Sequence, residues 1–405
     1  MDRVSRRRML AASIAAGAMT AGQGALAQAG AVPQPREGGK GGTDPGPRNI
    51  ELDRQNPDIL TPPLTDNGTL PNLKWSFGLS HMRLQPGGWA RQTTVRELPV
   101  STTIAGVNMR LNPGAIRELH WHKAAEWGIM LNGRARVTCI DPQGRSFIDD
   151  VAVGDLWYFP GGYPHSIQGL AEGCEFLLAF DDGDFSEDNT FSIADWFAHT
   201  PRSVLAKNFQ VPEDAFAKIP PRELYIFEAP VPPPLARQPV DPPNGAPPEP
   251  FVHRLMQQQP TRASGGTVRI ADSGNFKVAR TIAAALVEVE PGGMRELHWH
   301  PNAAEWQYYI EGQGRMTVFG ATAFARTFDY QAGDVGYVPL AMGHYIENTG
   351  TTTLRFLEMF RSPHYADLSL DQWMALLPPA LVKQHLHLDD ATIAKLRTRK
   401  DPVVG

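Results

Sequence analysis

The segment at residues 117–127 reads RELHWHKAAEW, and it returns almost unchanged at residues 295–306 as RELHWHPNAAEW. In the first copy, His120 and His122 are separated by one residue. Side chains alternate between the two faces of an extended strand, so both imidazoles point the same way. A carboxylate follows a few residues later in each copy. We therefore predict that the chain is a duplication and that each copy of this segment contributes metal ligands.

The repeat extends beyond this segment. His298 follows His120 by 178 residues, and His344 follows His165 by 179 residues. A Gly-Asp pair at residues 154–155 recurs at a similar offset. Because ordered pieces return in the same order and at nearly the same spacing, the two halves are expected to share one fold.

Between these motifs, the sequence breaks into short runs of alternating or continuous apolar residues. Gly, Pro or Asn-Gly separates the runs, which is typical of antiparallel strands joined by tight turns. The runs expected as strands in the first half are residues 102–111, 118–130, 135–140, 155–159 and 176–180. The first half is thus predicted to be all-β up to Asp181, as an antiparallel sandwich or barrel, and the second half repeats the plan.

Each half is expected to end in a small helical appendage. Ser192 with Asp195 resembles a capping box, and the apolar spacing of residues 196–209 is helical. A similar start recurs at residues 369–372. Such appendages could pack either on a neighbouring subunit or on their own barrel.

The N-terminus has the three parts of a secretory signal. Arginines occupy residues 6–8, an Ala-rich apolar stretch follows, and residues 25–27 form a small-x-small cleavage site. The arginine pair is typical of a twin-arginine (Tat) signal. We therefore expect export through the Tat route and a periplasmic or secreted protein. A disordered basic tail or a membrane anchor is the alternative, but the apolar stretch is short for a spanning helix. No membrane contact is expected of the mature form.

Composition suggests the domain boundaries. The predicted parts are a Tat-type signal peptide at 1–27, a flexible N-terminal arm at 28–55, a first domain at 56–228, a Pro-rich linker at 229–250 and a second domain at 251–405. The arm is rich in Gly and Pro, and the linker contains three consecutive prolines, a composition that makes a stiff connector.

The bulk composition bounds the function. The chain has 405 residues and a formal net charge of −5, with its only dense basic run in the leader. An acidic protein of this kind is not expected to bind nucleic acid. The two cysteines, Cys139 and Cys174, lie in separate apolar runs. A disulfide is one option for an exported protein, and two buried thiols are the favoured one.

Each half offers three histidines and one glutamate as metal ligands. The predicted ligands are His120, His122, Glu126 and His165 in the first half, and His298, His300, Glu305 and His344 in the second. Three neutral imidazoles and one carboxylate leave a divalent ion with a net charge near +1. In an octahedral shell these four ligands leave two open positions, whereas zinc usually prefers four ligands in total. A ligand set of nitrogen and oxygen atoms without a thiol suits manganese or iron. Spacing alone does not separate these two metals.

These spacings resemble the two signature motifs of the cupin superfamily, and their duplication makes the chain similar to a bicupin. Residues 75–385 resemble the bacterial oxalate decarboxylases in particular. The segments that carry this closer resemblance are 117–122, 147–150, 156–160, 295–301, 305–309 and 343–345. The resemblance implies two tandem double-stranded β-helix barrels, a mainly β fold in which each barrel is followed by short helices. It also implies Mn²⁺ in both halves, two per chain, and a homo-oligomer, either a trimer or a hexamer.

The halves differ after the last barrel strand. The first half has a longer polar segment there, and residues 186–190 are expected to form a lid over the first metal. In the family the matching loop carries a glutamate, and Glu187 falls on that position. A solvated polar turn is the plainer interpretation. Arg117 is taken as a site residue from the motif match, because strand alternation would place it opposite His120 unless a turn or bulge occurs near residues 113–114.

The second half keeps all its ligands and Arg295, and it adds Glu358 where the first half has Leu178. Glu358 is interpreted either as an alternative proton donor or, with preference, as a partner that pairs with Arg295 and stiffens a structural site.

The resemblance implies the reaction. Oxalate would bind the first manganese with Arg117 offsetting its second charge, dioxygen would act as a catalytic cofactor, and Glu187 would donate a proton to give formate and CO2. An oxalate oxidase that yields CO2 and hydrogen peroxide is the nearest alternative. A non-catalytic metal-binding bicupin is the alternative from another class.

Overall fold

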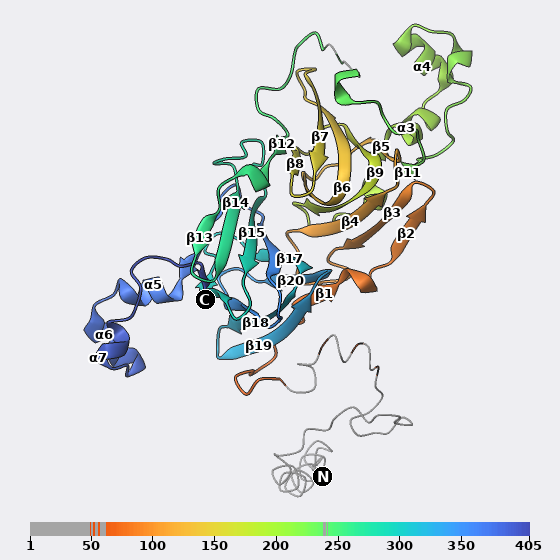
Figure 1. The fold of residues 1–405 in the computed structure, drawn as a ribbon. Helices are drawn as coiled ribbons and strands as arrows, with labels where there is room; N and C mark the ends of the chain where they lie inside the picture. The colour runs from red at the N-terminus through yellow and green to blue at the C-terminus, as the bar shows by residue number, and fades with distance from the viewer. Residues whose placement is uncertain (1–48, 50–51, 53–55, 57–61, 238–239, 241) are drawn as a thin grey trace, which may run out of the picture. The chain divides into compact units, whose positions relative to one another are not determined.

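Two long antiparallel strands, β6 (Glu126–Ile140) and β9 (His165–Phe180), form the centre of the first half of the fold (Figure 1). The structure is a computed structural model that describes residues 49, 52, 56, 62–237, 240 and 242–405. Residues 65–405 form one compact unit. Alternate side chains of the long strands, such as Val137 and Ile167, are fully buried. These strands therefore form one wall of a closed apolar interior.

Shorter strands complete this first barrel. They are β2 (Met82–Gln85), β3 (Gly88–Thr93), β4 (Ala105–Leu111), β5 (Ile116–Trp121), β7 (Ser146–Ala152), β8 (Leu156–Phe159), β10 (Phe191–Ser192) and β11 (Ile226–Phe227). The main sheet runs β12-β8-β6-β9-β4-β3-β2, where β12 is Val252–His253, while β5 pairs with β9, β10 and β11, and β7 pairs with β6. All of these pairs are antiparallel.

The second barrel repeats this plan with its long strands divided in two. Its strands are β13 (Thr261–Ala263), β14 (Gly266–Ala271), β15 (Ala283–Val289), β16 (Met294–Trp299), β17 (Glu305–Glu311), β18 (Gln313–Gly320), β19 (Phe324–Gln331), β20 (Asp334–Val338), β21 (Gly343–Asn348), β22 (Leu354–Phe360), β23 (Leu368–Ser369) and β24 (Val403–Val404). One sheet runs β1-β20-β17-β22-β15-β14-β13, where β1 is Lys74–Ser76, and the other runs β19-β18-β21-β16-β23 with β24 on β16.

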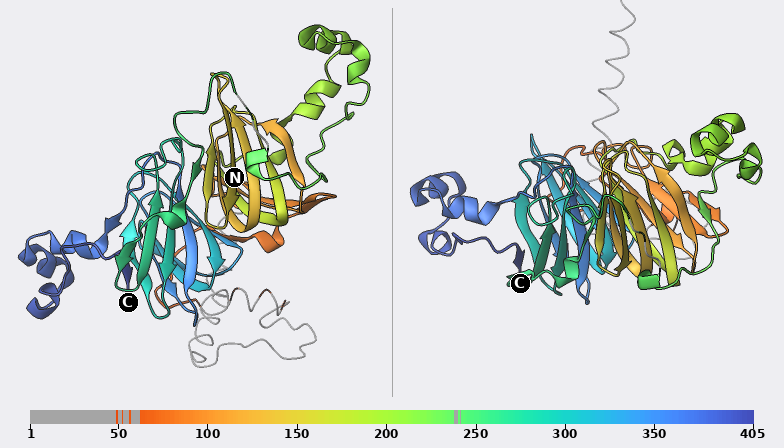
Figure 2. Two further views of the ribbon diagram at one scale, coloured as in Figure 1. Left: turned by 45° about the horizontal axis from the view of Figure 1, so that its top comes forward. Right: turned by 90° about the horizontal axis from the view of Figure 1, so that it is seen from above.

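The barrels exchange their first strands. β1 (Lys74–Ser76), which precedes the first barrel in sequence, pairs with β20 of the second, and β12 (Val252–His253) pairs with β8 of the first. One hydrophobic core contains both Trp127 and Trp306. The hydroxyl of Tyr158 also lies 2.8 Å from Oγ1 of Thr281 across the junction. The barrels are therefore packed side by side, as Figures 1 and 2 show.

Short helices extend from each barrel (Figure 2). They are α3 (Ile193–Ala198) and α4 (Arg202–Phe209) after the first, and α5 (Leu370–Ala375), α6 (Pro379–Leu386) and α7 (Asp390–Ile393) after the second. Ser192 and Ser369 cap α3 and α5, as predicted, by accepting a hydrogen bond from the third residue on. The single helix predicted over 196–209 is wrong. Pro201 separates α3 from α4, because proline lacks an N–H and restricts the residue before it.

The mainly β prediction with two barrels is confirmed. The run predicted as one strand at 118–130 is instead two strands, because the chain turns at residues 122–125 between β5 and β6. In the predicted linker, the described residues include a short 3-10 helix, η6 (Leu235–Arg237). The predicted signal peptide and most of the predicted arm lie outside the described residues. The domain boundaries stay a prediction.

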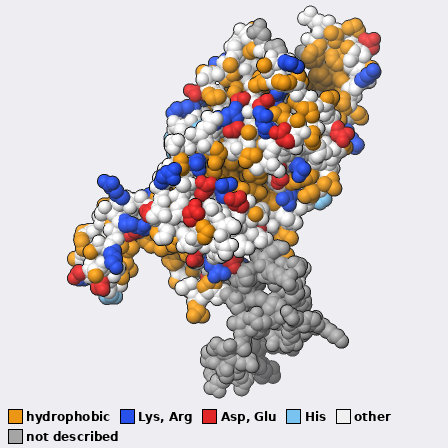
Figure 3. Space-filling view, viewed as in Figure 1, with side chains coloured by type: hydrophobic (Ala, Val, Ile, Leu, Met, Phe, Trp, Pro, Cys, Tyr) orange, Lys and Arg blue, Asp and Glu red, His pale blue; other side chains and the backbone are white. Residues whose placement is uncertain are grey.

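The surface visible in Figure 3 mixes charges over both barrels. Lys and Arg side chains lie among Asp and Glu side chains on this face, without a continuous basic area. Within the described part of the chain, no helix has the length and apolar character needed to cross a membrane. Cys139 and Cys174 are buried free thiols, and burial raises the pKa of Cys174 to about 12.

Candidate metal centres and lid

The four predicted ligands of the first half meet inside the first barrel. They are His120, His122, Glu126 and His165. One ligand atom of each lies within 4.8 Å of those of the other three, and all four residues are buried. His120 on β5 pairs directly with His165, the first residue of β9. Because β5 turns back at residues 122–125, the ligand on β6 reaches the same point.

The second barrel holds a matching cluster. It consists of His298, His300, Glu305 and His344, which are also buried and have ligand atoms within 4.8 Å of one another. His298 on β16 pairs with His344 on β21, as in the first barrel. The duplication seen in the sequence is therefore a duplication of two enclosed ligand clusters.

All six imidazoles in the clusters direct Nδ1 at a backbone carbonyl oxygen. The distances run from 2.6 Å between His120 and Glu118 to 3.1 Å between His344 and Met342, and the other four fall within this range. A carbonyl oxygen only accepts, so Nδ1 carries the hydrogen and Nε2 keeps its lone pair. This tautomer leaves Nε2 able to bind a metal.

Several atoms that face the cluster centres make no hydrogen bond with any described residue. These atoms are Nε2 of His165, His298, His300 and His344, and Oε2 of Glu305. A buried polar atom without a partner costs about 1–3 kcal/mol. Nε2 of His344 nevertheless lies only 2.8 Å from Oε2 of Glu305. One divalent cation in each cluster would satisfy these atoms together, and the thiol-free N/O set suits manganese or iron.

Burial and neighbouring charges favour the metal-binding protonation states of His120 and Glu126 and of their counterparts His298 and Glu305, whereas, despite burial, Glu305 raises the pKa of His300. Burial lowers the pKa of His120 well below its usual value, and Arg117 lowers it further. Burial opposes ionisation of Glu126, but the rings of His122 and His165 hold the pKa of its carboxyl well below its usual range. The corresponding residues of the second cluster shift in the same directions. A neutral imidazole and an ionised carboxylate are the forms that bind metals.

A β-bulge brings Arg117 near the first cluster. The register of β5 on β9 shifts between Arg117 and His120, so an extra residue resets the alternation of side chains. A turn or bulge was predicted near residues 113–114. The chain does turn there, with Gly114 at a φ of 79° and the Ala115 N–H donating to the Asn112 carbonyl oxygen, and the bulge itself lies further on, inside β5. The second barrel repeats the shift between Arg295 and His298.

Arg117 is buried, with only long contacts to its polar neighbours. Its Nη2 lies 3.4 Å from Oε2 of Glu187, and its Nη1 lies 3.4 Å from the carbonyl oxygen of Tyr225. Ordinary N–H···O bonds are about 2.9–3.0 Å long. The guanidinium is therefore held loosely, and Glu187 from the predicted lid faces it.

The predicted lid lies beside the first cluster. Residues 187–189 form a 3-10 helix, η4 (Glu187–Asn189), in which the Glu187 side chain is 9% exposed. A cavity of about 530 Å³ is lined by His122 and residues of the 186–190 segment. Just before the lid, Phe185 stacks on Phe180 with ring centroids 3.5 Å apart. The 186–190 segment and His122, a ligand of the first cluster, thus border the same cavity.

Arg295 has a different environment from Arg117. Its Nε lies 2.9 Å from Oε1 of Glu358, and its Nη2 lies 2.6 Å from Oδ2 of Asp367 and 2.8 Å from the Tyr365 hydroxyl. Of the two interpretations of Glu358, the contacts agree with the ion pair to Arg295. Burial raises the pKa of Glu358 despite that pair. Arg295 is therefore bound by two carboxylates, whereas Arg117 faces one at longer range.

The sequence analysis missed the groups that orient the ligand glutamates. In the first barrel, the indole Nε1 of Trp157 donates to Oε1 of Glu126 at 2.9 Å. In the second, Nε2 of Gln307 donates to Oε1 of Glu305 at 2.7 Å. Strand pairing holds the signal that could have found them: Gly128 opposes Trp157, and Gln307 opposes a glycine. In each barrel one large side chain thus lies beside the ligand glutamate, opposite a glycine of the paired strand. In the first barrel it is Trp157 on β8, and in the second it is Gln307 on β17.

Glu118 is a second residue that the sequence analysis missed. Its carboxylate accepts hydrogen bonds from the backbone N–H groups of Ala194, Leu224 and Tyr225, at 2.9, 2.6 and 3.0 Å. It thereby ties the start of α3, which follows the lid, to the segment that contacts Arg117. No local sequence motif marks this role, because the partners lie 76 to 107 residues away.

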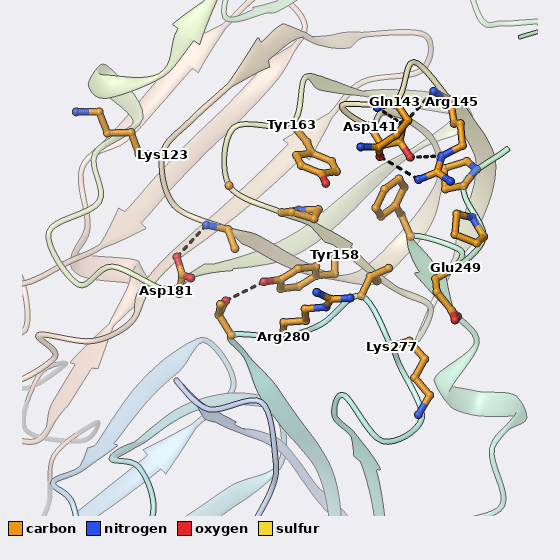
Figure 4. A pocket seen from close by; sticks show the side chains of 18 residues that line it. Lys123, Asp141, Gln143, Arg145, Tyr158, Tyr163, Asp181, Glu249, Lys277 and Arg280 are labelled. Carbon is orange, nitrogen blue, oxygen red and sulfur yellow. Dashed lines mark hydrogen bonds and ion pairs between the residues drawn. The ribbon is translucent and has the colours of Figure 1, made fainter. Parts of the chain in front are cut away.

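A separate cavity of about 410 Å³ opens where the two barrels meet (Figure 4). None of the predicted site residues lines it. Three of its charged side chains are engaged within its wall: Arg145 pairs with Asp141 at 2.6 Å, and Asp181 accepts from the backbone of Ala125 at 2.8 Å.

Comparison with known proteins agrees with this geometry. The sequence profile of the cupin family matches residues 81–215 and 253–394. Oxalate decarboxylase OxdC of Bacillus subtilis is 61% identical over 373 residues, which make up 92% of this chain and 97% of that protein. A probable oxalate decarboxylase of Arthroderma benhamiae is 43% identical over 385 residues, 93% of this chain and 94% of that protein.

Solved structures agree as well. The structure of Bacillus subtilis oxalate decarboxylase at pH 4.6 matches with a TM-score of 0.88 and 60% identity, covering 92% of this chain and 98% of that one. Another structure of that enzyme, determined in work on its Mn(II) centres, matches with a TM-score of 0.89 and covers 92% and 99%. The chain therefore belongs to the cupin family, as a protein with two cupin domains. Within that family, it is a member of the bicupin oxalate decarboxylases.

Proposed function

We propose that this protein decarboxylates oxalate to formate and CO2 and that turnover occurs at the first metal centre. The observation that carries the proposal is the difference between the two arginines. Arg117 faces the lid residue Glu187 through long contacts, whereas Arg295 is bound by Glu358 and Asp367. The relatives named as oxalate decarboxylases support the choice of substrate.

Oxalate has two carboxylates to hold. One would lie at the first ligand cluster, and Arg117 would offset the charge of the other. A guanidinium donates two parallel N–H bonds to a carboxylate, which fixes orientation as well as charge. Arg117 is suited to this role because its present contacts are long and its side chain is already desolvated.

We propose Mn²⁺ at both clusters, held by the four ligands of each. The support is the thiol-free ligand set here and the Mn(II) centres of the Bacillus enzyme. When bound, manganese with dioxygen as a catalytic cofactor would supply the reversible one-electron oxidation that weakens the C–C bond of oxalate.

Glu187 would deliver the proton. The C–C bond breaks, CO2 leaves, and a C–H bond forms on the remaining carbon with the proton from Glu187. Oxalate dianion and one proton thus give formate and CO2 without net oxidation. A closed lid keeps water away from this carbon. If no proton arrives, the second carbon is also oxidised to CO2 and dioxygen is reduced to hydrogen peroxide, which is the oxidase outcome.

The test compares Glu187→Ala with the native protein after both are loaded with Mn²⁺. The expected result is loss of formate production with both metals retained, and a rise of peroxide relative to formate. Asp184→Asn, an exposed change near the lid, serves as the control. Full formate turnover by Glu187→Ala would refute the assignment of the proton donor. If the loaded native protein makes neither formate nor peroxide from oxalate, the enzymatic proposal itself fails and a metal-binding role remains.

We also propose that the protein acts outside the cytoplasm as a homo-oligomer, a trimer or a hexamer. The Arg6-Arg7 signal pattern supports export. Trp196 and Trp373 on the helical appendages, 61% and 54% exposed, support subunit contacts. Retention of an Arg6→Lys/Arg7→Lys variant in the cytoplasm would support the first point. Light scattering of the purified protein tests the proposed oligomer. A monomer at micromolar concentration would contradict the proposed trimer or hexamer.

A further inference from the structure

One aromatic ring links two arginines beside the lid. The guanidinium carbons of Arg83 and Arg117 lie over the ring of Tyr225, 3.6 and 4.3 Å from its centroid. A guanidinium over a tyrosine face is attracted by the π electrons, more strongly when the pair is shielded from water. Tyr225 is buried, with 1% of its surface exposed. The ring therefore fixes the distance between the arginine of the proposed site and a second arginine on β2.

Arg83 also contacts the lid. Its Nη1 lies 3.6 Å from Oδ1 of Asp188, which follows Glu187 in sequence. Its Nη2 lies 2.6 Å from Oε1 of Glu223, two residues before Tyr225. One side chain thus joins the lid to the segment that carries the ring. The Asp188 side chain is 81% exposed, so this ion pair is weak and easily broken.

The Tyr225 segment is held in place from its other side. Its backbone has a φ of 60°, in the left-handed region that bulky residues rarely adopt. Its N–H donates to Oε2 of Glu118 at 3.0 Å, and its carbonyl oxygen accepts from Arg117. A strained residue persists when its surroundings fix it, so Tyr225 is a rigid support rather than a moving part.

The same residues line a cavity of about 280 Å³. Arg83, Tyr225, Glu187 and Asp188 contribute to its wall, with Gln92 beneath the lid. The amide side-chain oxygen of Gln92 lies 3.4 Å from the backbone N–H of Glu187. Among the described residues, this long bond and the Arg83 and Arg117 contacts join the lid to the elements around it.

We propose that Arg83 is a positioning residue that latches the lid closed over the first metal centre and thereby keeps Glu187 in place against Arg117. Its contact with Asp188 holds the lid, and its contacts with Glu223 and Tyr225 anchor it to a rigid segment. The latch is weak because the lid must open for each substrate. The chemical consequence rests on the proposed function: a lid that opens early withholds the proton and lets oxidation compete with formate release.

The experiment compares Arg83→Gln, Asp188→Asn and the double variant with Arg110→Gln. Arg110 is exposed on β4, so its replacement removes one positive charge, as Arg83→Gln does, but away from the lid. The first measurement is hydrogen–deuterium exchange of residues 186–190 in metal-free protein. Arg83→Gln is expected to speed exchange of these amides about three- to tenfold, as loss of a weak ion pair implies, while amides of β6 stay unchanged. The double variant should exchange no faster than Arg83→Gln, because both changes break the same contact.

The second measurement is the ratio of peroxide to formate in Mn²⁺-loaded protein. Arg83→Gln is expected to raise this ratio about three- to tenfold, and added salt should raise it in the native protein but not in Arg83→Gln, because salt screens the pair. Lid exchange and product ratio equal to those of Arg110→Gln would overturn the latch. If the native protein makes no formate, the proposed function fails, and the exchange measurement alone still decides whether Arg83 holds the lid.

Discussion

Nε of Arg295 lies 2.9 Å from Oε1 of Glu358, and neither side chain has any surface exposed to solvent. The first barrel has no such pair, because Leu178 occupies the position that matches Glu358 on the neighbouring strand. The two ligand clusters are alike, but their neighbouring arginines differ. Arg295 beside the second cluster is neutralised by carboxylates, whereas Arg117 beside the first is loosely held. Because of this contrast, we assign turnover to the first centre and a structural role to the second.

Replacement of Glu358 by Gln is expected to lower stability before it affects turnover. Removing one partner of a buried ion pair leaves the other charge uncompensated, which costs about 3 kcal/mol when a second carboxylate such as Asp367 remains. The free energy of unfolding, measured with urea, should fall by this amount, while formate production per manganese at the first centre stays near the native value. The exposed change Glu347→Gln should alter neither. A large loss of turnover in a stable Glu358→Gln protein would contradict the structural role.

Asp367 predicts a pH dependence of stability. Although burial opposes its ionisation, Arg295 and Lys400 hold the pKa of its carboxyl at about 2, against a usual 3.8. A depressed folded-state pKa stabilises the protein above the unfolded-state pKa, and this gain is lost as the pH falls towards the folded value. The gain amounts to about 2 kcal/mol. The difference in unfolding free energy between the native protein and Asp367→Asn should be constant above pH 5 and narrow below pH 4. A difference that does not change between pH 6 and 3.5 would contradict this linkage.

The sequence predicted the two-barrel fold because its information is local and repeated. The alternating runs and the duplicated ligand motif need no knowledge of distant partners. The strand exchange of β1 and β12 was not predictable in this way. A three-residue strand carries the same pattern whichever sheet it joins, so its placement depends on the packing of the two barrels. The break at Pro201 was visible in the sequence but was outweighed by the helical spacing around it.

The members of both clusters could be predicted from the sequence, whereas the residues that support them were only partly predictable. His120, Glu126 and their counterparts follow from spacing, and the structure brings them together. The bulge in β5 is set by its pairing with β9, so alternation alone could not locate it. Trp157 and Glu118 act through partners far along the chain. Such contacts have no sequence period, and only the fold reveals them.

Arg117→Lys is expected to lower kcat/KM for formate production by a factor of about 100 or more. A lysine keeps the charge but loses the planar fork that binds a carboxylate through two hydrogen bonds, so oxalate would be held in a less productive orientation. Kinetics should be accompanied by metal analysis, since both centres are expected to stay loaded. Arg134→Lys, an exposed change on β6, is the matched control. An unchanged kcat/KM in a fully loaded Arg117→Lys protein would remove Arg117 from the proposed site.

Trp157→Phe is expected to weaken manganese binding at the first centre alone. The indole N–H donates to Oε1 of the ligand Glu126 at 2.9 Å, and loss of such an orienting hydrogen bond typically costs about 10- to 100-fold in metal affinity. Trp127 offers a control of the same chemistry, because it is equally buried but its Nε1 has no hydrogen-bond partner among the described residues. Competition with a chelator should therefore release one manganese per chain early from Trp157→Phe and neither early from Trp127→Phe. Early release from both variants would show that packing around β6, rather than the hydrogen bond to Glu126, sets the affinity of the site.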